Sequence, residues 1–197
     1  MAGTMEVNRW PSGPSFFVNR MPSAPASAEP PAVTDIARLV RRAQAGDDDA
    51  FGELYQRFAR MVHGVVLARI ARTEVDDVVQ DVFMAAFERL RELREPAAFA
   101  GWLAAIARNR AADHGRRLVP VHPVVDTAAP PSTHERLEAL AILDAIRSLP
   151  EAYSETLVLR LVEGMTGEEI AERTGLTPGS VRVNLHRGMK LLREKLT

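Results

Sequence analysis

The chain has 197 residues, of which 46% are hydrophobic and 26% charged, a composition typical of a globular protein with one or two domains. Fibrous and wholly disordered chains are excluded. Its 25 basic and 26 acidic residues give a net charge of −1, so any nucleic-acid binding must come from local clusters of charge. The absence of cysteine excludes disulfides, thiol nucleophiles and thiolate zinc sites, and the five histidines lack metal-binding spacing. Without a membrane-spanning or signal-peptide run, we expect a cytoplasmic protein with no cofactor, no metal and no membrane insertion.

Residues 1–33 contain six prolines and show neither a helical nor an alternating period, so we predict a disordered tail. Two alternatives remain for this segment. Trp10, Phe16 and Phe17 could form a short motif that binds a partner, or translation could begin at Met21.

A second proline-rich stretch covers residues 118–133. It contains four prolines over a length that is unusual within a domain and typical of a linker. On either side of it, every periodic segment predicts a helix and none predicts a strand. We therefore predict an all-α protein with two small helical domains, over residues 34–117 and 134–197.

The first domain is predicted to be a bundle of four helices. Thr34 begins the first helix, Gly46 ends it, and a run of three aspartates begins the second. Thr73 and Asp76 have the spacing of a capping box before the third helix. Pro96 stands at the first turn of the fourth.

The second domain begins its helices with similar signals. Capping-box spacing occurs in three places, at Ser132 and Glu135, Ser148 and Glu151, and Thr166 and Glu169. The helix that follows Ser148 is predicted to run through Leu157, Val158, Leu161 and Val162 and to end at Gly164.

The end of the chain has the spacing of a helix-turn-helix. Ala171 is small enough for two helices to meet, Gly175 can adopt a positive φ in the turn, and Val181 can pack the second helix on the first. Residues 135–172 carry 3 basic and 9 acidic residues, whereas residues 173–197 carry 6 basic and 1 acidic. The cationic part is the proposed recognition helix, where phosphate neutralisation is needed.

The first domain has two charge clusters of opposite sign. Residues 108–117 carry four basic residues and one acidic residue. The third predicted helix instead carries Glu74, Asp76, Asp77 and Asp81 with no basic residue among them. Its apolar residues Val79, Phe83 and Phe87 suggest a protein-docking surface, although we favour a place in the core for them.

Four stretches of the sequence resemble the extracytoplasmic-function group of bacterial sigma factors: GDDDAFGELYQRF, DDVVQDVFMAAFERL, FAGWLAAIARNRAADHGRR and LPEAYSETLVLRLVEGMTGEEIAERTGLTPGSVRVNLHRGMKLLREKL. The resemblance covers about residues 34–117 and 134–197. It implies two helical domains, called region 2 and region 4, which bind core RNA polymerase through its β′ clamp and β flap and read the −10 and −35 promoter elements. It also implies an anti-sigma factor as a partner.

The resemblance assigns roles to the positions that match the family's motifs. Contact with the β′ clamp is assigned to Asp77, Gln80, Asp81 and Met84. Reading of the −10 element and strand opening are assigned to the loop 94–99 and to Trp102, Arg108, Asn109, Arg110, Asp113, His114 and Arg117. Reading of the −35 element is assigned to Ser180, Arg182, Val183, His186 and Arg187. Many relatives have other residues at Glu95, Pro96, Gly101, Val183 and Asn184.

Simple geometry agrees with the last of these assignments. Arg182 and Arg187 lie within roughly 140° of each other around a helix, so both can face a groove of DNA. Arginine suits both guanine edges and phosphates.

Two other functions are compatible with the residues alone. The first is a DNA-binding regulator that uses only the helix-turn-helix, with the N-terminal bundle sensing a ligand or dimerising. The second is an enzyme that acts on nucleic acid. No carboxylate cluster has clear metal spacing and no Ser/His/Asp set is recognisable, so we expect no enzymatic activity.

Overall fold

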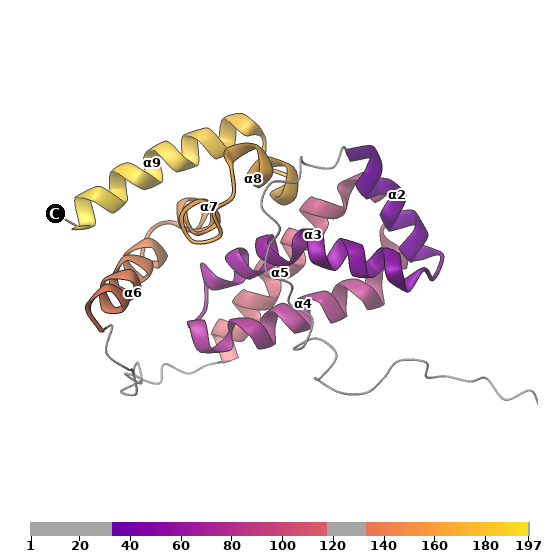
Figure 1. Ribbon diagram of the computed structural model, residues 1–197, viewed down its shortest axis with the longest axis horizontal. Helices are drawn as coiled ribbons and strands as arrows, with labels where there is room; N and C mark the ends of the chain where they lie inside the picture. The colour runs from indigo at the N-terminus through magenta and orange to yellow at the C-terminus, as the bar shows by residue number, and fades with distance from the viewer. Residues whose placement is uncertain (1–32, 118–132, 197) are drawn as a thin grey trace, which may run out of the picture. The chain divides into compact units, whose positions relative to one another are not determined.

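The computed structural model describes residues 33–117 and 133–196 (Figure 1). All regular structure in these two ranges is helical, as predicted. The first range contains α2 (Val33–Gln44), α3 (Asp48–Leu67), α4 (Val75–Arg89) and α5 (Phe99–Arg117), with the 3₁₀ turns η1 (Arg72–Glu74), η2 (Leu90–Glu92) and η3 (Pro96–Ala98). The second contains α6 (Thr133–Arg147), α7 (Glu151–Leu161), α8 (Gly167–Thr174) and α9 (Pro178–Leu196). Almost all of the predicted tail, almost all of the predicted linker and the predicted cap Ser132 lie outside the described residues.

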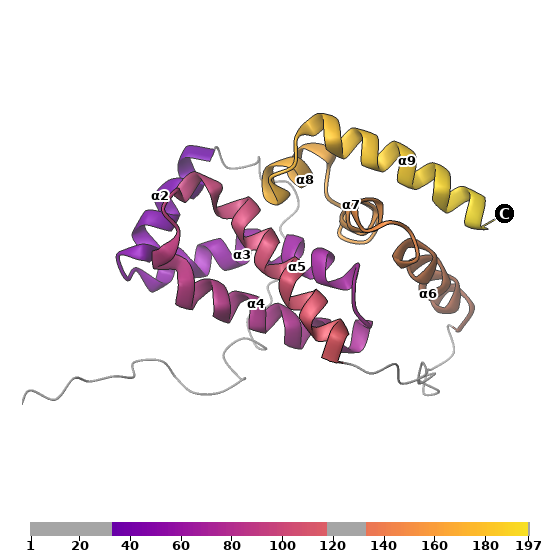
Figure 2. The ribbon, with the colours of Figure 1, turned by 180° about the vertical axis from the view of Figure 1, so that it is seen from behind.

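Helices α2–α5, here the first helix group, pack around α3. This helix contacts α2, α4 and α5, and α4 also contacts α5 (Figures 1 and 2). Between them lie fully buried side chains that include Leu54, Phe58, Met61, Phe99 and Leu103. The rings of Phe58 and Phe99 meet edge to face with their centroids 5.2 Å apart. Each such burial stabilises the fold by about 1.5–3 kcal/mol, so this apolar contact holds the first helix group together.

The boundary between α2 and α3 is as the sequence predicts. Gly46 has a φ of +93°, which glycine adopts without steric cost, and α2 ends there. Asp47 then begins α3 by accepting a hydrogen bond from the Ala50 N–H at 3.0 Å. This hydrogen bond, together with one from Arg42, holds the pKa of Asp47 below its usual range. The turn is therefore fixed from both sides.

Three predicted capping residues are wrong. Thr34 lies inside α2, which begins one residue earlier. Thr73 lies in η1, which runs directly into α4. The hydroxyl of Ser148 donates to the Ala145 carbonyl at 2.6 Å, and Pro150 precedes α7 in its place. The residue predicted to cap α4, Thr73, is thus part of a 3₁₀ turn. The residue predicted to cap α7, Ser148, instead bonds to a carbonyl at the end of α6.

Helices α6–α9, here the second helix group, pack around α7, which contacts α6, α8 and α9. Fully buried side chains here include Ile146, Leu157, Met165, Ile170 and Val181. A Cβ on Gly188 of α9 would lie 3.1 Å from the Leu157 side chain, so glycine permits a close approach of α9 to α7. Leu161 and Val162 lie at the end of α7, as predicted, with 49% and 50% of their surface exposed.

The two helix groups pack against each other. Helix α3 contacts α7 and α8, and α5 contacts α8. A Cβ on Gly64 of α3 would lie 2.6 Å from Cδ2 of Leu159 in α7, so the absence of a side chain allows this approach. A Cβ on Gly175 would likewise lie 3.0 Å from the Gly101 Cα. The two described ranges thus belong to one compact unit, and the sequence analysis did not predict this packing.

Candidate DNA and polymerase interfaces

The helix-turn-helix is formed by α8 and the first half of α9. Thr166 and Glu169 make the predicted capping box at the start of α8. Gly175 has a φ of +74° and its N–H donates to the Ala171 carbonyl at 3.1 Å, which ends α8 in the left-handed conformation. Val181 is 1% exposed and packs α9 into the second helix group. The predicted turn is therefore confirmed.

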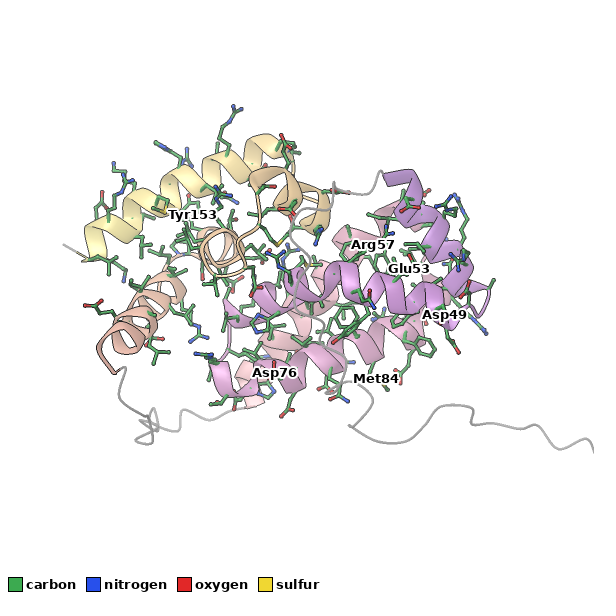
Figure 3. All side chains as sticks on the ribbon, viewed as in Figure 1. Asp49, Glu53, Arg57, Asp76, Met84 and Tyr153 are labelled. Carbon is green, nitrogen blue, oxygen red and sulfur yellow. The ribbon has the colours of Figure 1, made fainter. Side chains whose placement is uncertain are left out.

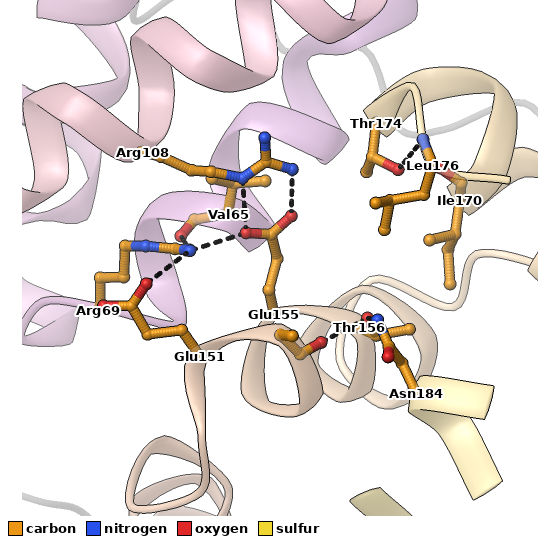
Figure 4. A network of polar contacts seen from close by, with 11 residues as sticks. Val65, Arg69, Arg108, Glu151, Glu155, Thr156, Ile170, Thr174, Leu176 and Asn184 are labelled. Carbon is orange, nitrogen blue, oxygen red and sulfur yellow. Dashed lines mark hydrogen bonds and ion pairs between the residues drawn. The ribbon is translucent and has the colours of Figure 1, made fainter. Parts of the chain in front are cut away.

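One side of α9 is exposed over its first three turns. The five residues assigned to the −35 element are all exposed: Ser180, Arg182, Val183, His186 and Arg187. Ser180 also helps to begin α9, since its N–H donates to the Thr177 hydroxyl at 3.1 Å. Asn184 points elsewhere, because its amide donates to the Thr156 hydroxyl of α7 at 3.4 Å (Figure 4). The structure thus brings the five predicted residues to one accessible surface.

The outer side of α4 forms an acidic surface. Asp77, Gln80, Asp81 and Met84 are all exposed, at a spacing of three and four residues that places them on one side of the helix. Figure 3 shows Met84 projecting from α4 on the side away from α7 and α9. Val79 and Phe83 are buried as expected, but Phe87 is 41% exposed and meets Phe51 edge to face at 5.0 Å. The expectation that Phe87 belongs to the core is therefore wrong, and its ring extends the apolar end of this surface.

Helix α5 and the turn before it contain the residues assigned to the −10 element. Glu95 accepts a hydrogen bond from the Ala97 N–H at 3.3 Å and begins the turn η3. The Trp102 ring is half-buried beside Phe99, with the centroids 5.9 Å apart. Asn109 and Arg110 are exposed. The side chain of Arg117 lies outside the described part of the chain.

The far end of α5 meets α4. Asp113 is paired with Arg116 on its own helix. Nε2 of His114 lies 3.2 Å from a Glu74 carboxylate oxygen, at an angle that forms no hydrogen bond. A small hollow between α4 and α5 is lined by Val78, Asp81, Arg110, Asp113 and His114. Asp81, which the resemblance assigns to polymerase contact, therefore lies next to Arg110, Asp113 and His114, which it assigns to reading of the −10 element.

Arg108 differs from its neighbours because it is held by the second helix group (Figure 4). Its Nε and Nη2 donate to the two carboxylate oxygens of Glu155 in α7, at 3.0 and 2.7 Å. Nη2 of Arg69 lies 2.8 Å from the same carboxylate. Burial alone raises the pKa of Glu155, but the hydrogen bonds and charges of the two arginines outweigh it, and the pKa lies below its usual range. The carboxylate is therefore ionised at neutral pH.

Family comparisons match each helix group separately. A model described as Sigma-70 region 2 matches residues 54–119, and one described as Sigma-70, region 4 matches residues 139–192. The chain is also 32% identical over 184 residues to the ECF RNA polymerase sigma-E factor of Haemophilus influenzae, which covers 83% of this chain and 96% of that protein. The chain belongs to the extracytoplasmic-function group of bacterial sigma factors. As a sigma factor, it acts with RNA polymerase and promoter DNA in promoter-specific initiation of transcription.

Further similarities agree with this membership. The RNA polymerase sigma factor CarQ of Myxococcus xanthus is 36% identical over 167 residues, which cover 80% of this sigma factor and 95% of CarQ. Among solved structures, CnrH in complex with the cytosolic domain of CnrY has a TM-score of 0.58 and 28% identity, and covers 82% of this chain and 96% of that chain. The helical arrangement is thus that of the sigma factor fold.

Other kinds of site are not found in the described ranges. Within residues 33–117 and 133–196, no group of three or more His, Asp or Glu side chains could hold a metal ion. The helices that the structure describes include none with the length and apolar character of a membrane span.

Sequence reasoning missed Glu155 and Arg69. Arg69 lies outside the four stretches that carry the family resemblance. Glu155 lies within the fourth stretch, but the resemblance assigns it no role, and a lone acid in α7 has the appearance of a surface residue. One signal was available: Ser154, Glu155 and Thr156 interrupt the apolar residues of α7 as a polar run, and all three are buried. A buried acid needs a partner of opposite charge, and that need points to an arginine elsewhere in the chain.

Proposed function

We propose that α9 reads the −35 element, that α5 reads the −10 element and helps to open the strands, and that α4 binds the β′ clamp. The second helix group would meet the β flap. No covalent chemistry is required of these residues, so the protein is a binding subunit and not an enzyme. It acts in the cytoplasm, where RNA polymerase works.

One observation carries this proposal. Helix α9 follows the turn of the helix-turn-helix, in which Gly175 has a φ of +74°. It buries Val181 and Leu192 on one side and exposes the five residues assigned to the −35 element on another. The second helix of such a motif enters the major groove, and the side chains of its first turns reach the base edges. Arg182 and Arg187 supply the cationic groups that guanine and phosphate attract.

The −10 assignment is supported by the composition of α5. Opening a duplex requires that single-stranded bases be held, and an aromatic ring next to cationic side chains stacks bases and binds backbone phosphates. Trp102 near the start of α5, followed by the exposed Asn109 and Arg110, provides these groups.

The acidic surface of α4 supports binding to the polymerase. Asp77 and Asp81 are exposed one turn apart, and Met84 adds a flexible apolar side chain that is 43% exposed. A surface of this kind suits a basic partner with an apolar centre. CnrH is similar in structure and forms a complex with the cytosolic domain of CnrY, which supports an anti-sigma factor as a further protein partner here.

Charge reversal on α4 tests the proposal. In the double variant Asp77→Arg and Asp81→Arg, we expect loss of co-purification with core RNA polymerase and unchanged helical circular dichroism, because both residues are exposed. The control is Asp49→Arg with Glu53→Arg, which makes the same change in net charge on exposed residues of α3 that have no assigned role in polymerase binding. Retained co-purification of the α4 variant would contradict the assignment.

A further inference from the structure

The contact between the two helix groups uses a residue that the proposed function needs. Arg108 belongs to the basic run of α5, and α5 is the helix proposed to read the −10 element. Its guanidinium nevertheless forms a two-pronged ion pair with Glu155 of α7, at 2.7 and 3.0 Å (Figure 4). Such paired geometry is the one in which arginine also binds a phosphate. Glu155 thus uses the two donors of Arg108, Nε and Nη2, that could otherwise bind a phosphate.

Glu155 is placed to hold more than one arginine. Glu155 is 4% exposed, and the Arg69 side chain is 11% exposed. Nη2 of Arg69 lies 2.8 Å from Oε2 of Glu155, the oxygen that also accepts from Nε of Arg108. Arg69 is in turn fixed by donating to the Val65 carbonyl of α3 at 2.9 Å. One buried carboxylate therefore joins α7 both to the segment that follows α3 and to α5.

Further polar contacts cross the same interface. Arg147 donates to the Leu67 carbonyl at 2.8 Å, Arg173 donates to the Arg57 carbonyl at 2.7 Å, and Nδ1 of His63 lies 2.6 Å from the Glu163 carboxylate. The close approach of Gly101 to Gly175 places the helix-turn-helix turn against the beginning of α5. The contact thus covers α5 near Trp102 as well as at Arg108.

The other two proposed surfaces are not covered. Asp77 and Asp81 on α4 are exposed, and so are Arg182 and Arg187 on α9. We propose that the packed arrangement is a closed form in which Glu155 withholds Arg108 and the adjoining surface of α5 from DNA, while the polymerase-binding and −35 surfaces stay accessible. This inference rests on the proposed role of α5. Release of Glu155 is then a step that precedes reading of the −10 element.

Two charge changes at position 155 test the closed form. Glu155→Gln removes the charge that attracts both arginines, and Glu155→Asp keeps the charge on a side chain too short to reach both of them. Glu168→Gln is the matched control, since it removes one charge from an exposed residue of α8. Glu155→Asp leaves net charge unaltered, so a change in that variant cannot come from overall electrostatics.

The first readout is the distance between the helix groups. The chain has no cysteine, so spin labels attach only at introduced ones, and Gln56→Cys in α3 with Lys195→Cys in α9 uses two exposed positions. We expect a narrow distance distribution in the unsubstituted background and in Glu168→Gln. In Glu155→Gln and Glu155→Asp we expect a second, longer population. An unchanged distribution in both variants would overturn the closed form.

The second readout is binding of a labelled 20-nucleotide single-stranded DNA of random sequence. If the open population rises, the apparent affinity rises with it, and we expect a gain on the order of tenfold for Glu155→Gln. One more arginine then binds a phosphate, so the slope of the logarithm of the binding constant against the logarithm of the salt concentration should steepen by about one. The gain in affinity should be smaller for Glu155→Asp. Glu168→Gln should show only the small increase that the loss of one negative charge produces.

The two readouts separate the possible failures. Equal DNA affinity of Glu155→Gln and Glu168→Gln, with unchanged distances, would overturn the inference. Altered distances with unaltered DNA affinity would show that α5 does not bind DNA, which would overturn the proposed −10 role and the masking that rests on it. Altered distances with increased affinity in both position-155 variants would support the inference.

Discussion

The basic helices α5 and α9 carry the same kind of side chain in two different states. In α5, the Arg108 side chain is 32% exposed and is paired with a buried carboxylate of another helix. In α9, Arg182 and Arg187 are exposed, and neither pairs with a carboxylate within the ranges that the structure describes. To bind DNA, α5 must therefore release a protein partner from Arg108, whereas α9 releases only water and counterions.

This difference separates a structural role from a binding role. An arginine that neutralises a buried acid contributes to stability, and its removal leaves that acid without compensation. An arginine on a bare surface contributes almost nothing to stability, since exposed charges are solvated in both the folded and unfolded states. Substitutions of the same residue type in α5 and α9 should then produce different measurable losses.

The largest contrast in stability is expected between Arg108→Ala and Arg187→Ala. Arg108→Ala leaves the buried Glu155 with Arg69 alone, and we expect it to lower the free energy of unfolding by about 2–3 kcal/mol. Arg187→Ala should change it by less than about 0.5 kcal/mol. Urea unfolding followed by circular dichroism measures both. Equal losses in the two variants would remove the distinction between the helices.

Two cationic residues of α9, Arg182 and Lys190, should contribute differently to binding of the −35 element. Arg182→Ala should weaken promoter binding by about 1–3 kcal/mol and relax the preference at one −35 position. Lys190→Ala, two turns further along, should weaken all sequences alike and reduce the salt slope by about one. A library with each −35 position varied, assayed at two salt concentrations, tests both expectations. A uniform loss for Arg182→Ala would instead indicate phosphate anchoring.

Two glycines of α3 sharpen the comparison between covered and bare surfaces. A Cβ at Gly64 would lie 2.6 Å from Leu159 and 2.9 Å from Glu163, so Gly64→Ala should destabilise the contact between the helix groups by about 1–3 kcal/mol. Nothing lies within 4 Å of a Cβ at Gly52, so Gly52→Ala should stabilise α3 by about 0.4–1 kcal/mol. Thermal unfolding of the two variants measures the opposite signs. A stabilising Gly64→Ala would contradict the close packing.

The smallest effect concerns pH. The hydrogen bond to Glu163 raises the pKa of His63 above 6.5, against the opposing effect of burial. A raised pKa in the folded protein adds stability that is fully present below about pH 6.5 and is lost as the pH rises through the folded value. The His63 side chain is 38% exposed, so we expect less than about 1 kcal/mol. The stability difference from His63→Gln should shrink between about pH 6 and about pH 8, and a difference independent of pH would exclude a charged His63.

The sequence predicted features that depend on neighbouring residues and missed those that depend on distant ones. The capping box at Thr166 and the positive φ at Gly175 follow from spacing within a few residues, and both are confirmed. Local patterns also compete, which is why η1 displaced the predicted cap at Thr73. Glu155 bonds to Arg108, 47 residues earlier, and no local pattern records such a pairing.

The roles of the candidate residues follow the same rule. Apart from Phe87, whose predicted core position is wrong, periodicity and the family motifs predict which of the named residues of α4 and α9 are exposed, because helical spacing separates the inner and outer sides of a helix. For α5 the same reasoning predicts an exposed basic helix. The structure differs at Arg108, since a second group of helices that is not adjacent in the sequence packs there.

Transcription of fragmented host DNA by core RNA polymerase with this protein, followed by sequencing of the 5′ ends, tests the proposed promoter recognition most directly. We predict transcripts that start downstream of one shared pair of −10 and −35 elements, and loss of the −35 preference at one position with Arg182→Ala. Transcripts with no shared upstream elements, or identical transcripts from core polymerase alone, would contradict promoter recognition by α5 and α9.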